Sequence, residues 1–172
     1  GKITADDRTI LGYKKENFRM SFGNTFRYKD FELYMLFTGI FGGNGYGQAV
    51  NYYAFRTSSD VQGDNNFNHG WWTPENKSNK YPRINYTDGR YTPLQGYGFV
   101  RLQDLSLSYT FRQPWVQKAG IGNLKVYMAC KNLFTISGWE GGDPEVQQTL
   151  GSGYTYGYPL SRTVSFGLNL TF

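Results

Sequence analysis

The stretch RTVSFGLNLTF, residues 162–172, alternates apolar and polar residues from Val164 onward. Because the side chains of a β-strand point alternately to opposite faces, this pattern predicts a strand with two unlike faces. Its apolar face consists of Val164, Phe166, Leu168, Leu170 and Phe172. Its polar face consists of Thr163, Ser165, Gly167, Asn169 and Thr171. The core of a soluble β-sandwich and a lipid bilayer would both suit the apolar face, so this stretch alone does not decide between them.

The composition of the 172 residues favours β structure with many turns, because 19% of the residues are aromatic and 22 are Gly. No apolar run is long enough for a transmembrane helix, and no signal-peptide pattern opens the sequence. Since the chain starts at Gly1 without Met, we expect a fragment or a processed chain. The single cysteine, Cys130, excludes an internal disulfide, and we interpret it as a core or lipid-facing thiol.

Charge and titratable residues argue against several function classes. The net charge of +5 would permit an acidic partner, but the longest basic run is only Lys14 with Lys15, so we expect no nucleic acid partner. The only histidine, His69, lies in a polar stretch, and we expect neither a histidine-based triad nor an enzyme. Paired catalytic carboxylates are not expected either, because the acidic residues of the turn near Pro144 have nothing beside them in sequence to raise a carboxyl pKa: Glu140, Asp143 and Glu145.

Five segments have strand patterns near the ~10 residues that a tilted membrane strand needs: 18–28, 31–41, 99–111, 124–134 and 161–172. Only Lys29 and Asp30 separate the first two, which predicts a tight hairpin with Arg27 beside Glu32 on its polar face. In that register four cross-strand pairs on the other face match apolar with apolar: Tyr28 with Phe31, Phe26 with Leu33, Phe22 with Phe37, and Phe18 with Phe41. In the third segment the apolar phase changes after Leu102, which predicts a β-bulge near Gln103 and Asp104.

The connections between these segments differ in length in a regular way. Long connections, residues 42–98 and 135–160, alternate with the short turn at Lys29 and a medium connection at 112–123. Such sorting is typical of outer-membrane barrels, which have long extracellular loops and short periplasmic turns. We therefore expect an all-β transmembrane antiparallel barrel, with residues 1–17 as a remnant of an extracellular loop and residues 18–172 as barrel strands. A soluble, aromatic-rich, carbohydrate-binding β-sandwich stays open as the alternative.

Five stretches together carry a family resemblance: GKITADDRTILG (1–12), WWTPENKSNKYPR (71–83), FVRLQDLSLSYTF (99–111), LKVYMACKNLFTISGWEGGDPE (124–145) and YPLSRTVSFGLNLTF (158–172). In this order they resemble the C-terminal end of SusC/RagA-type TonB-dependent outer-membrane transporters of Bacteroidetes. The resemblance implies a barrel of roughly 22 strands around a plug, of which this chain would supply the last five.

The resemblance also implies a function in the bacterial outer membrane. Such transporters import glycans or oligopeptides together with a SusD-like surface lipoprotein, and TonB, which supplies the energy, acts through the N-terminal part of the receptor. The alternating final strand that ends in Phe172 resembles the signal by which the barrel-assembly machinery recognises its clients. Its apolar residues would then contact outer-membrane lipid.

Two candidate sites lie outside the predicted strands. Aromatic side chains of the long connections could stack on a substrate or pack against the lipoprotein, and the residues concerned are Trp71, Trp72, Tyr81 and Trp139. At the start of the chain, GKITADD resembles the second half of a calcium-binding loop. In this loop Lys2 would provide a backbone carbonyl and Asp7 the last carboxylate ligand of a structural calcium ion, with no other cofactor expected.

Overall fold

The computed structural model describes residues 4–46, 72–79, 94–139, 143–145 and 159–172. Its main sheet has five antiparallel strands in the order β1-β2-β5-β6-β7. The bounds of these strands are β1 Phe18–Tyr28, β2 Phe31–Phe41, β5 Phe99–Phe111, β6 Asn123–Ser137 and β7 Thr163–Thr171. The described part also contains a 3-10 turn, two three-residue strands and one helix: η1 Ala5–Asp7, β3 Asn44–Tyr46, β4 Leu94–Gly96 and α2 Pro114–Lys118. No helix in these described ranges has the length and apolarity that a membrane span requires.

The strands of the main sheet agree closely with the predicted segments. β1, β2 and β5 have the predicted bounds, whereas β6 continues past residue 134 to Ser137 and β7 is shorter than residues 161–172. Within the predicted long connection 42–98, the structure adds a short ladder near its two ends, where β3 pairs with β4. Strands of three residues are too short for an alternating pattern to show in the sequence.

The predicted hairpin register is confirmed. Tyr28 pairs with Phe31 and Phe18 pairs with Phe41, with the intervening pairs as expected. On the polar face the Arg27 Nε lies 2.6 Å from Glu32 Oε2. The turn contains no Gly, and Lys29 itself adopts the left-handed conformation, with φ of 53°.

The predicted bulge in β5 is also confirmed. Against β2 the pairing shifts between Leu102 and Asp104, so Gln103 is the extra residue on β5. Against β6 the pairing shifts at the same place, but there the extra residue is on β6, where Asn132 and Leu133 lie opposite Gln103. The shift lets Leu102 pair with Phe37, which belongs to the apolar face of β2. The apolar residues before and after the bulge therefore lie on one face of the sheet.

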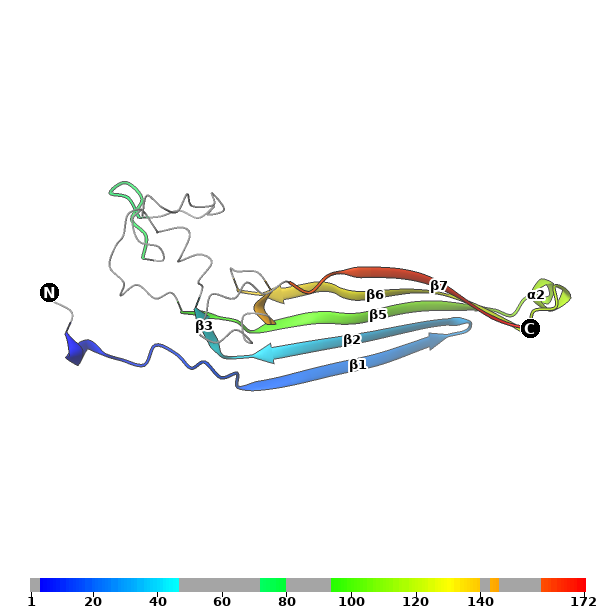
Figure 1. Ribbon diagram of the computed structural model, residues 1–172, viewed down its shortest axis with the longest axis horizontal. Coiled ribbons are helices and arrows are strands. Elements are labelled where there is room, and N and C mark those ends of the chain that lie inside the picture. The colour runs from blue at the N-terminus through cyan, green and yellow to red at the C-terminus, as the bar shows by residue number, and fades with distance from the viewer. Residues whose placement is uncertain (1–3, 47–71, 80–93, 140–142, 146–158) are drawn as a thin grey trace.

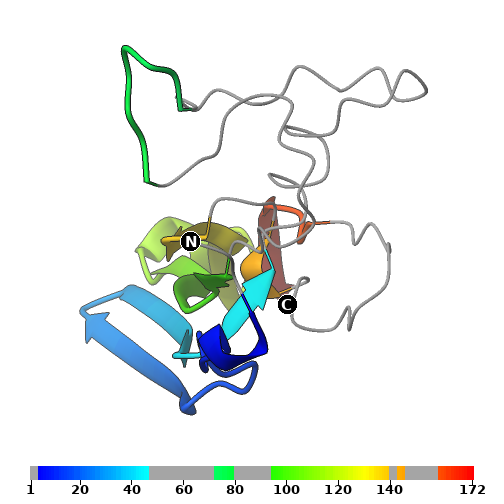
Figure 2. The same cartoon turned by 90° about the vertical axis from the view of Figure 1, so that its left-hand side faces the viewer.

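The sheet has two ends of different character (Figure 1). The turn between β1 and β2 and the helix α2 lie at one end, with the C-terminus, and we call this the short-turn end. The connections that leave β2 and β6 lie at the opposite end, which we call the long-connection end. Figure 2 views the molecule from the long-connection end, so that the strands of the main sheet are seen from their ends, with β3 beside them.

The apolar face of the main sheet is exposed to solvent on the outer strands β1 and β7, whereas Leu102 and Cys130 on the central strands are each only 5% exposed. Phe22 is 54% exposed, Phe26 54%, Phe166 79% and Leu168 60%. By contrast, the described buried apolar cluster consists of residues at the long-connection end: Ile40, Tyr97, Phe99 and Trp139. The centre of the sheet therefore has no core of its own within the described residues, and its apolar face needs another apolar phase to cover it.

Candidate functional site

The described residue that organises the long-connection end is Arg101, which lies on β5 and points to the polar face of the sheet, opposite Thr38 and Thr135. Its side chain is 2% exposed. A guanidinium group so deeply buried is costly unless carboxylates and hydrogen bonds compensate for its lost hydration. The environment of Arg101 supplies both.

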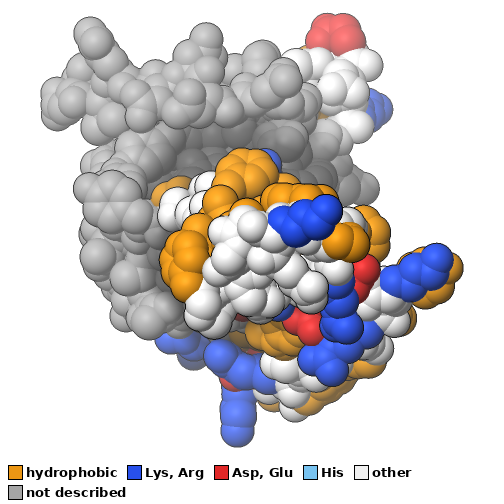
Figure 3. All heavy atoms as spheres, turned by 90° about the vertical axis from the view of Figure 1, so that its right-hand side faces the viewer, with side chains coloured by type: hydrophobic (Ala, Val, Ile, Leu, Met, Phe, Trp, Pro, Cys, Tyr) orange, Lys and Arg blue, Asp and Glu red, His pale blue; other side chains and the backbone are white. Residues whose placement is uncertain are grey.

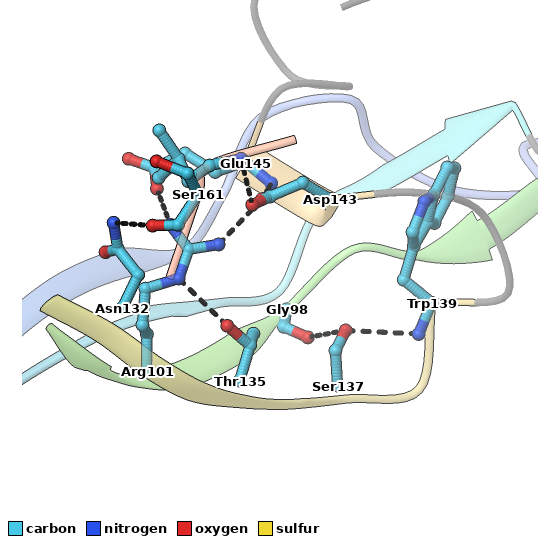
Figure 4. A network of polar contacts seen from close by, with 10 residues as sticks. Gly98, Arg101, Asn132, Thr135, Ser137, Trp139, Asp143, Glu145 and Ser161 are labelled. Atoms are coloured by element: carbon cyan, nitrogen blue, oxygen red, sulfur yellow. Dashed lines mark hydrogen bonds and ion pairs between the residues drawn. The ribbon is translucent and has the colours of Figure 1, made fainter. Parts of the chain in front are cut away.

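Each nitrogen of the Arg101 guanidinium donates to a separate oxygen (Figure 4). Nε donates to Thr135 Oγ1 at 2.9 Å, Nη2 to Asp143 Oδ1 at 2.7 Å and Nη1 to Glu145 Oε2 at 2.5 Å. The face of the group also lies 4.9 Å from the ring centroid of Phe99. Because these contacts use all three nitrogens, Arg101 is suited to hold a loop in place on the sheet.

Asp143 carries this attachment further along the chain. Its carboxylate accepts the backbone N–H of Glu145 at 2.9 Å and that of Leu160 at 3.3 Å. Next to Leu160, the carbonyl of Ser161 accepts Asn132 Nδ2 at 3.2 Å (Figure 4). The connection between β6 and β7 is thus attached to the sheet at both its start and its end, and we call these contacts the loop clamp.

A second set of contacts joins the start of this connection to the segment before β5. Ser137 Oγ donates to the Gly98 carbonyl at 2.8 Å and accepts the Trp139 N–H at 3.1 Å. The Trp139 ring is 9% exposed and packs near Gly45 and Tyr97. The Trp139 Nε1 is buried without a hydrogen-bond acceptor among the described contacts. In this structure Trp139 therefore packs in the buried apolar cluster at the long-connection end.

Two ionisable groups at this end have shifted pKa values. The hydrogen bond from Arg19 lowers the pKa of Glu16, and the Glu16 carboxylate lies 2.7 Å from Arg19 Nε. Burial raises the pKa of Tyr97, and the negative charge of Glu16 adds to this shift. The Tyr97 hydroxyl donates to the Lys14 carbonyl, so its neutral form ties the segment before β1 to the segment before β5.

The predicted site residues are only partly brought together. Trp72 is described and 36% exposed, and Trp139 is buried in the rim cluster described above. Trp71 and Tyr81 lie outside the described residues, so contact of these aromatic residues with a substrate or partner stays a prediction. The five apolar residues of the final strand share one exposed face, as the alternation predicts, with exposed fractions from 44% at Leu170 to 87% at Phe172. Their contact with lipid also stays a prediction.

The predicted calcium ligands are not brought together in the described residues. Lys2 lies outside them, and the Asp7 carboxylate accepts the Thr4 N–H at 2.7 Å as part of a capping box around η1. Within the same described ranges, no three acidic, His or Cys side chains gather closely enough to hold a metal ion. The calcium site stays a prediction.

Sequence reasoning missed Arg101. The sequence showed a basic residue between Val100 and Leu102, on the polar phase of its strand, but Arg19 and Arg27 occupy the same phase of β1. Nothing in the local pattern distinguishes the buried Arg101 from those exposed residues. Its two carboxylate partners lie far along the chain, since Asp143 is 42 and Glu145 is 44 residues further on.

Comparison with known proteins identifies relatives over the whole chain. No protein-family model matches. TonB-dependent receptor P3 of Formosa agariphila is 30% identical over 183 residues, which cover 100% of this chain and 18% of the relative. TonB-dependent receptor P26 of the same organism is 28% identical over 100% of this chain and 18% of the relative. TonB-dependent receptor SusC of Bacteroides thetaiotaomicron is 34% identical over 43% of this chain and 7% of the relative.

Solved structures share the fold. The RagAB peptide transporter structure matches with a TM-score of 0.72 at 23% identity, covering 99% of this chain and 19% of the matched chain. The RagAB peptide importer in the 'open-open' state matches with a TM-score of 0.70 at 23% identity and the same coverage. This chain spans about a fifth of the length of these proteins. Along its whole length the chain is therefore similar to a portion of TonB-dependent receptors and has the fold of part of the RagAB structures, which is consistent with the SusC/RagA type.

Proposed function

We propose that this chain forms the last five strands of a roughly 22-stranded barrel in the bacterial outer membrane. The whole receptor imports glycans or oligopeptides and is not an enzyme. It acts with a SusD-like surface lipoprotein, and TonB energises it through parts of the receptor other than this chain. The names of its relatives support this proposal, since SusC is a TonB-dependent receptor and RagAB is a peptide importer.

The observation that carries the proposal is the apolar face that extends over all five strands of the sheet and is exposed on the outer strands β1 and β7. Apolar cross-strand pairs occur on this face from β1 to β7, for example Phe26 with Leu33, Leu105 with Cys130, and Met128 with Phe166. A surface of this extent in water would drive aggregation, whereas in a bilayer it contacts acyl chains. Strands of 9 to 15 residues are also long enough to cross a bilayer when tilted.

The opposite face of the sheet has the character of a barrel interior. Arg27, Glu32 and Lys125 form a charged group on it, with Lys125 Nζ 3.5 Å and Arg27 Nε 2.6 Å from the Glu32 carboxylate. Charged groups in lipid would be costly, so this face belongs on the water-filled or plugged side of the wall. A path for polar substrates would run along this face.

The outer strands of the sheet imply that further strands belong to the wall. Within the described strands, β1 pairs only with β2 and β7 pairs only with β6, so each leaves one edge of backbone N–H and C=O groups unpaired. Unpaired edges are not tolerated in a hydrocarbon environment. We infer that strands from the rest of the receptor pair with β1 and β7.

The β-sandwich alternative requires a second sheet to cover the apolar face. In the described residues the second sheet consists of β3 and β4, with three residues each, and it lies at the long-connection end. Two such short strands are too few to cover five strands of 9 to 15 residues. This observation favours the membrane over the sandwich.

A matched pair of cysteine variants in the full-length receptor tests the proposal. In a Cys130→Ala background, Phe166→Cys places a label on the apolar face and Ser165→Cys places the same label on the polar face. We expect a bimane label at position 166, but not at 165, to be quenched by lipids brominated on their acyl chains, in receptor recovered from outer membranes. A receptor that remains in the aqueous fraction without detergent would refute the membrane assignment.

A further inference from the structure

A row of aromatic side chains borders the apolar face at the short-turn end. Ring centroids lie 4.6 Å apart for Phe31 and Tyr109, 4.7 Å for Tyr109 and Phe111, and 5.8 Å for Phe111 and Trp115. Tyr28 extends the row beyond Phe31, its cross-strand partner. We call these five residues the aromatic row, and it runs from the hairpin turn across β2 and β5 to α2. Side chains of this kind are favoured at the boundary between hydrocarbon and headgroups.

The helix α2 carries the last aromatic residue of this row, Trp115, and a basic residue, Lys118. Val116 is 2% exposed and anchors the helix, whereas Trp115 is 52% exposed and packs against Phe111 at the margin of the apolar face. Lys118 follows Trp115 by three residues, so the two side chains lie on the same side of the helix. Lys118 is thereby directed to the margin of the apolar face.

The charges at this end are not balanced. Asp30 pairs with Arg112 at 3.0 Å, and Glu32 pairs with the polar-face cations Arg27 and Lys125. Two basic residues, Lys29 and Lys118, have no carboxylate partner in the part of the chain that the structure describes. The Lys29 ammonium lies 5.4 Å from the ring centroid of Tyr28, which places it at the other end of the aromatic row. Figure 3 shows basic and hydrophobic side chains side by side at this end of the molecule.

We propose that the aromatic row, with Lys29 and Lys118 at its two ends, is a docking surface for phospholipid headgroups. The aromatic rings lie at the depth of the glycerol and upper acyl region, and the two ammonium groups bind headgroup phosphates. The inference rests on the proposed membrane orientation, in which the short-turn end faces the periplasm and the periplasmic leaflet. It adds to that orientation a preference for anionic lipids at a defined place on the barrel.

Charge complementarity is the reason for choosing a phospholipid as the occupant. A lysine that extends from an apolar surface keeps its methylene stem against acyl chains and its ammonium group among phosphates. Basic residues at such a boundary favour anionic over zwitterionic lipids, because each gains additional attraction to the negative surface. Among the described residues, no carboxylate competes with a headgroup phosphate for either lysine.

The test uses the full-length receptor, purified in detergent from outer membranes and titrated with phosphatidylglycerol while native mass spectrometry counts the lipids bound. We expect the double variant Lys29→Gln/Lys118→Gln to bind phosphatidylglycerol about tenfold more weakly than the unchanged receptor. Trp115→Ala tests the aromatic part of the surface, and this variant should also bind phosphatidylglycerol more weakly than the unchanged receptor. Phosphatidylcholine in place of phosphatidylglycerol should reduce the difference between the receptor and the double variant.

The control is Lys14→Gln/Lys15→Gln, which removes the same charge from the segment before β1, at the long-connection end. We expect this variant to bind phosphatidylglycerol as the unchanged receptor does. Equal binding by all variants, or equal loss in both double variants, would overturn the inference. If the receptor is recovered from outer membranes and shifts on a gel when boiled, such a result leaves the proposed function standing. If it is not a membrane protein at all, both proposals fail.

Discussion

Replacing Arg101 with Met should loosen the connection between β6 and β7 while the sheet stays intact. The substitution keeps most of the side-chain volume but removes the charge that the Asp143 carboxylate faces at 2.7 Å. Asp143 is 9% exposed, so it would be left as a nearly buried carboxylate without a cation. Removing one partner of a buried ion pair typically costs about 3 to 5 kcal/mol.

The expected cost for Arg101→Met is lower than that range, at about 2 to 3 kcal/mol, because the loop clamp lies at the rim and can open to water. Asp143 also keeps two backbone N–H donors, from Glu145 and Leu160, and these offset part of the loss. Glu145 adds little, since its side chain is 45% exposed and its pairing with Arg101 is screened by solvent.

Hydrogen exchange of the full-length receptor, followed by mass spectrometry, measures this opening. Peptides that contain Glu145 and Leu160 should exchange about 30- to 150-fold faster in Arg101→Met, since 1.4 kcal/mol corresponds to a factor of ten. The matched control is Arg27→Met, in which a 75% exposed arginine loses its pairing with Glu32, at an expected cost below about 1 kcal/mol. Exchange within twofold of the unchanged receptor in Arg101→Met would show that the clamp does not hold the connection.

Further predictions concern the wall and its rim. Phe166→Arg, near the middle of β7, should destabilise the barrel by about 2 to 4 kcal/mol and Ser165→Arg by far less, as measured by the gel-shift temperature of each receptor variant. Gly43→Ala should lower the free energy of chemical unfolding by about 2 to 4 kcal/mol, because Gly43 has φ of +78° and an added Cβ would lie 2.3 Å from the Tyr97 ring. Its control is Gly120→Ala, at φ of +73° with open space around the added Cβ, which should cost only about 1 to 2 kcal/mol. The raised pKa of Tyr97 means that its stabilising contribution is complete below the unfolded value near 10 and is lost as the pH rises through the folded value. After correction for the intrinsic rise of amide exchange with pH, the protection of peptides at the long-connection end should therefore fall above about pH 10 in the unchanged receptor, and Tyr97→Phe should remove that fall.

The strands and their register could be predicted because the sheet has one apolar face over its whole length. With period-two alternation, an error of one residue would turn every side chain of a strand to the wrong face, so the pairing of Phe18 with Phe41 follows from the pattern. The bulge at Gln103 was predictable for the same reason, since a change of phase needs an extra residue. The strand register and the bulge can both be read from the pattern of residues that are adjacent in the sequence.

The loop clamp depends on residues that are far apart, and it could not be predicted. The sequence places Asp143 and Glu145 in a turn without indicating a partner, and Arg101, which pairs with both, lies on a strand 42 and 44 residues earlier. The helix α2 was missed because five residues are too few for a helical period, and Pro114 indicated only a turn. Short elements and long-range charge pairs are determined by tertiary structure, which local patterns do not contain.

In the proposed receptor, the loop clamp would separate two requirements: a stable sheet and a connection that can vary. Because Asp143 and Leu160 meet at the sheet, the two ends of the connection are held together by residues that belong to the wall. The cost of closing a loop between fixed ends rises only slowly with its length, so residues 146–158 are free to change in number and type at little cost to the barrel. In the proposed receptor, substitutions and insertions there would provide a route by which one scaffold acquires new specificities, and the same segment would be the place to graft a foreign peptide for display on the cell surface.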